Sequence, residues 1–234
     1  MNDAPLLELD SVHAYYGQSH VLQGVSLTVP AGSVVSLMGR NGVGKSTTLK
    51  SVFGIVRVAR GRIFFRGQEI TRVPAHLVAR RGIALVPEDR RIFSALTVRE
   101  NVLLAAAGRA DAIDEALGWF PTLERYLDRA GDRLSGGEQQ MLAIARALVA
   151  GPSLVLIDEP LEGLAPIVAE RIAETLRALR GRMTVVLVEQ NLKWLIDVAD
   201  YHYVMDHGRV AEHGTSAWLR SNPALVEQYL GVAA

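Results

Sequence analysis

Gly39-Arg40-Asn41-Gly42-Val43-Gly44-Lys45-Ser46, followed by Thr47, is the most informative stretch of this chain and fits the pattern G-x-x-x-x-G-K-[ST]. Glycines at these places let backbone N–H groups close around phosphate oxygens, while Lys45 adds charge and the Ser46 hydroxyl can bind Mg²⁺. An apolar run at residues 34–38 precedes the stretch, and a helical pattern follows it. This context predicts a phosphate-binding loop and disfavours a glycine-rich turn with a chance Lys-Ser pair.

Composition excludes several classes of protein. The chain has 234 residues, of which 49% are hydrophobic, and we expect a single domain over residues 1–234. The 25 basic and 25 acidic side chains give no net charge, so we expect no nucleic-acid partner, which usually requires a basic face. The chain has no cysteines, no apolar run of the roughly 18–20 residues that span a bilayer, and no signal-peptide core. Membrane association is therefore expected only through a partner.

Hydrophobic periodicity predicts an α/β architecture. Apolar strands alternate with helices in the second half, which argues for a parallel sheet. Residues from about 88 to 150 lack strand-like runs and indicate an inserted helical subdomain, with the core at residues 1–87 and 151–234. We expect strands at residues 6–12, 21–29, 34–38, 63–65, 83–86, 154–157, 185–188 and 203–205, helices at 45–53, 74–81, 98–107, 111–119, 137–148, 168–179 and 192–197, and a hairpin and a last helix within 208–231.

Two acidic residues follow the apolar strand at residues 154–157. Asp158, at the end of that strand, can face the phosphate loop and hold Mg²⁺ or a water bound to it. Glu159 is placed to polarise an attacking water. An acidic pair after a strand can also cap a helix, but its presence in one chain with a phosphate loop favours the catalytic interpretation.

The string Leu-Ser-Gly-Gly-Glu at residues 134–138 opens a helix and makes a second anion-binding N-terminus on the same polypeptide. Ser135 also suits a helix cap, so its structural and functional roles coincide. Because one loop accounts for one nucleotide, a second phosphate cradle implies a sandwich between two such subunits.

Together, these motifs resemble the ATP-binding subunit of an ABC transporter over nearly the whole chain. The resemblance implies a P-loop NTPase ABC ATPase fold, with a mainly parallel sheet core, an N-terminal antiparallel β subdomain and an inserted helical subdomain. It implies ATP and Mg²⁺ as ligands, with ATP on residues 39–47. It also implies that a signature, made of Ser135, Gly136, Gly137 and Glu138, contacts the γ-phosphate of ATP held by a partner subunit.

In this family an aromatic residue after the first strand stacks on adenine. Tyr15 and Tyr16 both precede Gly17, and the family pattern favours Tyr16. Two alternatives stay open: Tyr15 stacks on the base, or both residues serve packing.

Three positions depart from the general family. Glu88 stands where most relatives carry Gln and can still bind Mg²⁺ or its water. Gln190 stands where most carry a catalytic-site His; it can hydrogen-bond a γ-phosphate oxygen but cannot become a cation near neutral pH. Ala165 replaces the usual Asp. Since the residues that bind phosphate and activate water are present, an inert subunit is disfavoured.

The same departures indicate one subgroup of this family. Residues 86–93, 163–166 and 188–191 are similar to the smaller ATP-binding subunit of branched-chain amino acid importers. Such a subunit lies at the cytoplasmic face of the membrane and works with a second, non-identical ATPase, permease subunits and an extracytoplasmic solute-binding protein. Importers of urea, amides or another small solute are an alternative, because Leu161-Glu162-Gly163 differs from the Ser-Leu-Gly expected for amino acids.

Other functions fit less well. Soluble ABC ATPases of translation or DNA repair usually join two cassettes or insert coiled coils, and a P-loop kinase or GTPase leaves residues 134–138 unexplained. A non-catalytic ATP-binding assembly subunit stays open. The permease is expected to dock near residues 88–96, where Arg90, Arg91, Ile92 and Phe93 look exposed; alternatively, Ile92 and Phe93 fill the helical core.

Overall fold

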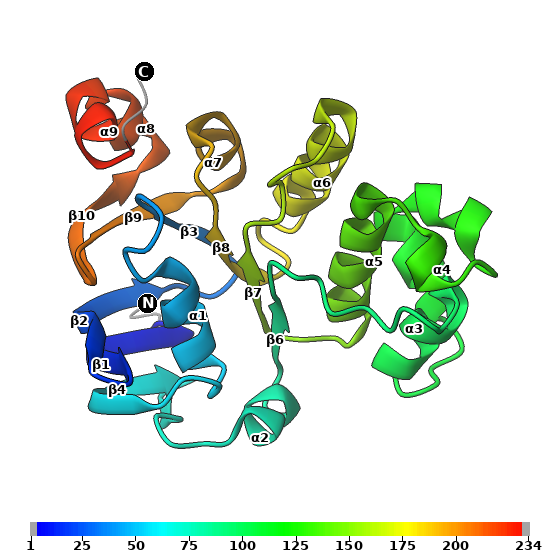
Figure 1. The fold of residues 1–234 in the computed structure, drawn as a ribbon, viewed down its shortest axis with the longest axis horizontal. Coiled ribbons are helices and arrows are strands. Elements are labelled where there is room, and N and C mark those ends of the chain that lie inside the picture. Colours follow the sequence, from blue (N-terminus) through cyan, green and yellow to red (C-terminus); the bar gives the residue numbers. More distant parts are fainter. Residues whose placement is uncertain (1–3, 231–234) are drawn as a thin grey trace.

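The computed structural model describes residues 4–230. Two β-sheets form its centre, with the strand orders β2-β1-β4-β5 and β10-β9-β3-β8-β7-β6 (Figure 1). The strands are β1 (Leu7–Tyr16), β2 (Ser19–Val29), β3 (Val34–Met38), β4 (Val58–Phe65), β5 (Gln68–Glu69), β6 (Ile83–Val86), β7 (Leu154–Asp158), β8 (Thr184–Val188), β9 (Tyr201–Asp206) and β10 (Arg209–Thr215). The helices are α1 (Lys45–Val52), α2 (Ala75–Arg80), α3 (Val98–Ala105), α4 (Ala112–Trp119), α5 (Gly136–Val149), α6 (Pro166–Ala178), α7 (Leu192–Val198), α8 (Ser216–Arg220) and α9 (Pro223–Leu230).

The larger sheet is parallel from β6 to β9, and β10 joins its edge as an antiparallel strand. Every residue of β3, β7 and β8 is buried, which explains why these strands are continuous apolar runs in the sequence. Leu37 pairs with Val188, and Val188 pairs with Asp158. The loops that follow these three strands therefore meet at one edge of the sheet, where ligands of open α/β sheets bind.

The smaller sheet is antiparallel, since β1 pairs with β2 and β4, and β4 pairs with β5. Helix α1 lies between the two sheets (Figure 1). Leu49 and Val52 of α1 share a buried cluster with residues of both sheets, among them Leu9 and Val186. The predicted fold is confirmed: a mainly parallel core carries an N-terminal antiparallel sheet.

The chain between β6 and β7 holds α3, α4, α5 and short 3₁₀ helices, which Figure 1 shows on the side of β6 away from the antiparallel sheet. Phe120 is fully buried among them. The buried side chain of Asn101 bonds both the N–H and the carbonyl of Phe93, each at 2.9 Å, and so fixes the entry to these helices. Helical structure was expected over residues 88–150; the division into a separate subdomain stays a prediction.

A few elements differ from the expected ones. β1 runs to Tyr16 rather than to residue 12, because its pairing with β2 continues as far as Tyr16 and Ser19. Helix α6 begins at Pro166 rather than at 168, as proline suits the first helical turn. β5 and α8, of two and five residues, are too short for a periodic pattern and were not predicted.

Candidate nucleotide site

The phosphate loop, residues 39–44, connects β3 to the start of α1. Gly39 and Gly44 have φ angles of 143° and 109°, which L side chains rarely adopt. A Cβ at Gly39 would collide with the carbonyl oxygen of Met205, and a Cβ at Gly44 would lie 2.8 Å from Leu22 Cδ2. Both positions therefore require glycine, and the loop backbone leads directly into the N-terminus of α1, which favours anions.

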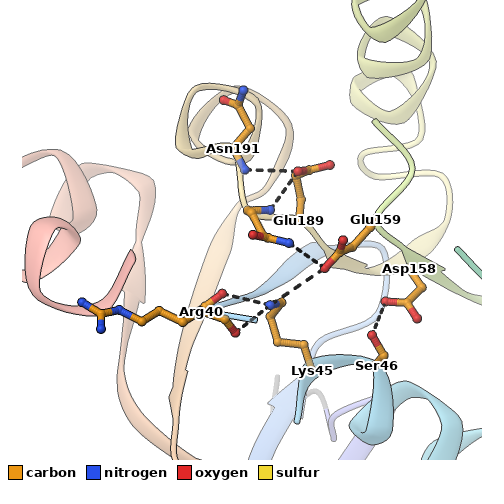
Figure 2. A network of polar contacts seen from close by, with 9 residues as sticks. Arg40, Lys45, Ser46, Asp158, Glu159, Glu189 and Asn191 are labelled. Carbon is orange, nitrogen blue, oxygen red and sulfur yellow. Dashed lines mark hydrogen bonds and ion pairs between the residues drawn. The ribbon is translucent and has the colours of Figure 1, made fainter. Parts of the chain in front are cut away.

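Lys45 is the buried cation of this site, with only 4% of its surface exposed. Its Nζ donates to the carbonyl oxygens of Gly39 and Arg40 at 2.9 and 3.0 Å and lies 3.9 Å from Glu159 Oε1 (Figure 2). Burial lowers the pKa of Lys45, and the charges of Glu159 and Asp158 oppose that shift. The ammonium group is thus held at the point where β3 and β7 end.

Ser46, in the first turn of α1, lies opposite Asp158, the last residue of β7. Ser46 Oγ donates to Asp158 Oδ1 at 2.8 Å (Figure 2). Burial raises the pKa of the Asp158 carboxyl, while the bond from Ser46 lowers it. Glu88, from the loop after β6, lines a cavity of about 320 Å³ together with Lys45, Ser46 and Glu159. The sequence-predicted residues of the phosphate and metal sites therefore come together in the fold.

The hydroxyl oxygen of Ser46 and the carboxylate oxygens of Asp158 and Glu88 are ligands that suit Mg²⁺, which takes its remaining ligands from nucleotide phosphates and water. Within residues 4–230, no cluster of three or more His, Cys, Asp or Glu side chains suits a metal ion. An ion held by Ser46, Asp158 and Glu88 would take its remaining ligands from phosphate oxygens and water.

Glu159 and Gln190 come from the ends of neighbouring strands. Gln190 Nε2 donates to Glu159 Oε1 at 3.0 Å. The backbone N–H of Glu159 donates to the Val188 carbonyl at 2.9 Å, and Glu159 has a φ of 48°, a left-handed conformation uncommon for a residue with a side chain. Strained backbone of this kind gathers at functional sites, where surrounding structure holds it.

Glu162 is a site residue that the sequence did not reveal as one. It lines the cavity with Lys45 and Glu159. A hydrogen bond shared with Glu159, the charge of that residue and burial raise the pKa of Glu162 to about 7. Its place three residues after Glu159 was the available clue, since a tight turn brings such positions together.

The two candidate tyrosines differ in their surroundings. The Tyr15 ring stacks on the His20 ring at a centroid distance of 4.2 Å and an angle of 7°, so one of its faces is already covered. Tyr16 is 51% exposed at the end of β1. The following strand returns to Val21, which lines the nucleotide cavity. Tyr16 is therefore accessible on the hairpin whose second strand reaches the cavity at Val21.

The signature residues lie apart from the phosphate loop, at the start of α5, which Figure 1 shows well away from α1. The N–H of Ser135 donates to Glu138 Oε2 at 2.7 Å, and the N–H of Glu138 donates to Ser135 Oγ at 3.4 Å, which together form a capping box. A Cβ at Gly137 would lie 2.6 Å from Val168 Cγ1, so glycine lets α6 pack against this helix start.

Comparison with protein families matches residues 22–162 to the ABC transporter family. The high-affinity branched-chain amino acid transport ATP-binding protein of Pseudomonas aeruginosa is 45% identical, over 97% of this chain and 100% of that protein. The lipopolysaccharide export system ATP-binding protein of Escherichia coli K12 is 35% identical, over 97% of this chain and 98% of that protein.

Solved structures of the family superpose closely. A nucleotide-free ATP-binding cassette from an ABC transporter has a TM-score of 0.84 at 25% identity and covers 99% of this chain and 100% of its own. The ADP conformation of another such cassette has a TM-score of 0.83 at 26% identity, over 98% of this chain and 100% of its own. The chain belongs to the ABC transporter family, as an ATP-binding subunit that hydrolyses ATP to power transport by membrane permease components.

Proposed function

We propose that this chain is the smaller ATPase subunit of an importer for branched-chain amino acids. The 45% identity to the Pseudomonas aeruginosa branched-chain amino acid protein, along almost the whole chain, carries this proposal. A probable branched-chain amino acid transport ATP-binding protein of Archaeoglobus fulgidus, at 38% over 97% of this chain, supports it. The relatives from lipopolysaccharide export make export a second candidate, and Glu162 keeps urea and amide import open.

ATP would lie along the phosphate loop, with its β- and γ-phosphates at Lys45 and with contacts from Gly39, Arg40, Asn41, Gly42, Val43, Gly44, Ser46 and Thr47. The buried Lys45 ammonium offers a strong attraction there, because charge interactions are little screened in a water-poor site. Ser46, Asp158 and Glu88 would hold Mg²⁺, which neutralises charge on the phosphates when it is bound.

Glu159 acts as the general base for the water that attacks the γ-phosphate. The hydrogen bond from Gln190 to Oε1 fixes the rotation of the carboxylate that accepts the proton of that water. Gln190 stays neutral at working pH, so its contribution is orientation and hydrogen bonding rather than charge. Positioning of this kind is the main source of rate in phosphoryl transfer.

The signature residues serve a second nucleotide. Because they lie away from Lys45, we infer that Ser135, Gly136, Gly137 and Glu138 face ATP bound by a second, non-identical ATPase subunit, whose own signature completes the site on this chain. An extracytoplasmic solute-binding protein would deliver the solute. In the part of the chain that the structure describes, no helix is long and apolar enough to cross a membrane, and the permease would hold this subunit at the cytoplasmic face.

A groove of about 680 Å³ is the proposed place of permease docking. It is lined by Lys50, Phe53, Ile55, Ala84, Leu85, Val86, Pro87, Glu88, Asp89, Arg90, Arg91, Ala105, Ala143, Arg146, Ala147 and Ala150. It joins the core to the helices between β6 and β7, which we propose form a subdomain, and it contains Glu88 of the nucleotide cavity. Apolar side chains and three arginines among its lining residues suit an amphipathic helix with acidic residues.

Two side chains of the expected docking segment are less exposed than predicted. Arg90 is half-buried and donates to Gln139 Oε1 of α5 at 3.2 Å. Ile92 packs against the helical core, whereas Phe93 is exposed under the Arg146 guanidinium, 4.6 Å from the ring centroid. Arg91 is exposed as predicted. Variants of Arg90 would therefore disturb α5 itself, and Arg91 is the cleaner probe.

Glu159→Gln should bind ATP normally but hydrolyse it about 10²–10⁴-fold more slowly, because the amide cannot accept the proton of the attacking water. Single-turnover hydrolysis by the full-length chain measures this. Glu170→Gln, on the exposed side of α6, is the control and should keep the normal rate. Unchanged turnover in Glu159→Gln would place the base elsewhere.

Tyr16→Ala should weaken ATP binding by about 1–3 kcal/mol, roughly 5- to 150-fold in Kd, through loss of base stacking. Tyr15→Ala should change Kd less than threefold, roughly within the effect of an ordinary surface substitution, because His20 covers one face of the Tyr15 ring. Titration with ATP and with inorganic triphosphate separates a base contact from a phosphate contact. The opposite ranking of the two variants would assign the stacking to Tyr15.

Arg91→Glu should lower co-purification with the permease at least about tenfold, because reversing a charge at an interface opposes an acidic partner. Arg133→Glu is a matched control: each arginine is exposed beside a neighbouring aspartate, but Arg133 is outside the groove. Equal recovery of both variants with the permease would rule out docking in this groove.

A further inference from the structure

The segment between β8 and α7 contains a buried carboxyl group that the proposed chemistry does not use. Glu189 is 4% exposed. Its Oε1 accepts hydrogen bonds from the backbone N–H groups of Gln190 and Asn191, at 2.8 and 3.1 Å (Figure 2). One oxygen therefore holds two consecutive peptide groups of the turn that leaves the sheet.

This arrangement restrains Gln190 from both sides. On the N-terminal side of Gln190, Val188 is fixed in the sheet by its pairing with Leu37 and Asp158. On the C-terminal side, Asn191 Oδ1 accepts a hydrogen bond from the N–H of Lys193 at 3.1 Å and caps α7. With its own N–H bound to Glu189, Gln190 has little backbone freedom, and its side chain reaches Glu159 Oε1.

A carboxyl group is a costly way to satisfy two N–H groups here. Burial raises the pKa of Glu189, hydrogen bonds from the backbone of Asn191, Gln190 and Leu161 lower it, and the charge of Glu159 raises it. Glu159 and Glu162 line a second cavity of about 360 Å³ together with Glu189, so the neighbourhood is already acidic. A buried acid among acids disfavours folding, which makes a role in general loop packing a poor explanation.

We propose that Glu189 is a positioning residue for ATP hydrolysis, which holds the turn so that the Gln190 amide orients the Glu159 carboxylate toward the attacking water. This inference rests on the roles proposed above for Gln190 and Glu159. What the turn requires from Glu189 is an acceptor oxygen, since the bonds from Gln190 and Asn191 both come from backbone N–H groups. Glutamine carries that oxygen without the charge, and alanine does not.

Glu189→Ala, Gln190→Ala and the double variant test the inference in the full-length chain, with kcat, KM for ATP and equilibrium ATP binding measured for each. Glu189→Ala should lower kcat about 10- to 100-fold, the scale of a misplaced catalytic group, with ATP Kd changed less than about twofold. If Glu189 acts through Gln190, the double variant should be no slower than Gln190→Ala alone.

Glu189→Gln should recover the rate to within about threefold of the parent chain, because its amide oxygen can accept both N–H groups. Thr175→Val is the control for buried polar loss: Thr175 is buried on α6 and bonds the carbonyls of Trp119 and Arg171, remote from the strand ends. The Thr175→Val variant should have a lower thermal stability but an unchanged kcat.

Two results separate the inference from the role of Gln190. A normal rate in Gln190→Ala would overturn the role proposed for that side chain and the inference with it. A slow Gln190→Ala with a normal Glu189→Ala, or a double variant slowed by the product of both single effects, would overturn the inference alone.

Discussion

The parallel pairing of β7, β8 and β3 is the constraint on which the site depends. Hydrogen bonding in register places Leu37, Val188 and Asp158 side by side, so the phosphate loop, Glu159 and the turn at residues 189–191 must leave the sheet together. No loop has to cross a long distance to build the site. A strand with every residue buried has little freedom to shift, and this rigidity extends to the proposed catalytic groups at the strand ends.

Charge balance around Lys45 is the second determinant. One buried ammonium group is surrounded by carboxyl groups from three loops, which burial and mutual repulsion make costly to ionise together. Phosphates bring still more negative charge. The arrangement therefore favours a bound divalent cation with the nucleotide, and it gives Glu162, which shares a hydrogen bond with Glu159, a pKa close to neutral pH.

Much of this organisation could be predicted from the sequence. The glycine pattern at residues 39–46, the apolar runs of the central strands and the capping box at Ser135 are local features, and the structure forms each of them. Glu162 and Glu189 were not found this way, because their importance comes from burial and from hydrogen bonds inside tight turns, which hydrophobic periodicity and motif patterns do not report. The same is true of Arg90, which looks like a surface residue in the sequence but packs under α5. The extent of β1 depends on its partner strand, which periodicity alone does not specify.

Equilibrium ATP binding by Lys45→Ala tests the central claim most directly. This variant should lose useful ATP affinity, because it lacks the buried charge aimed at the β- and γ-phosphates. Lys193→Ala, which removes the lysine above the Trp194 ring on α7, should bind ATP like the parent chain. Near-normal affinity in Lys45→Ala would contradict the assignment of residues 39–47 as the nucleotide site.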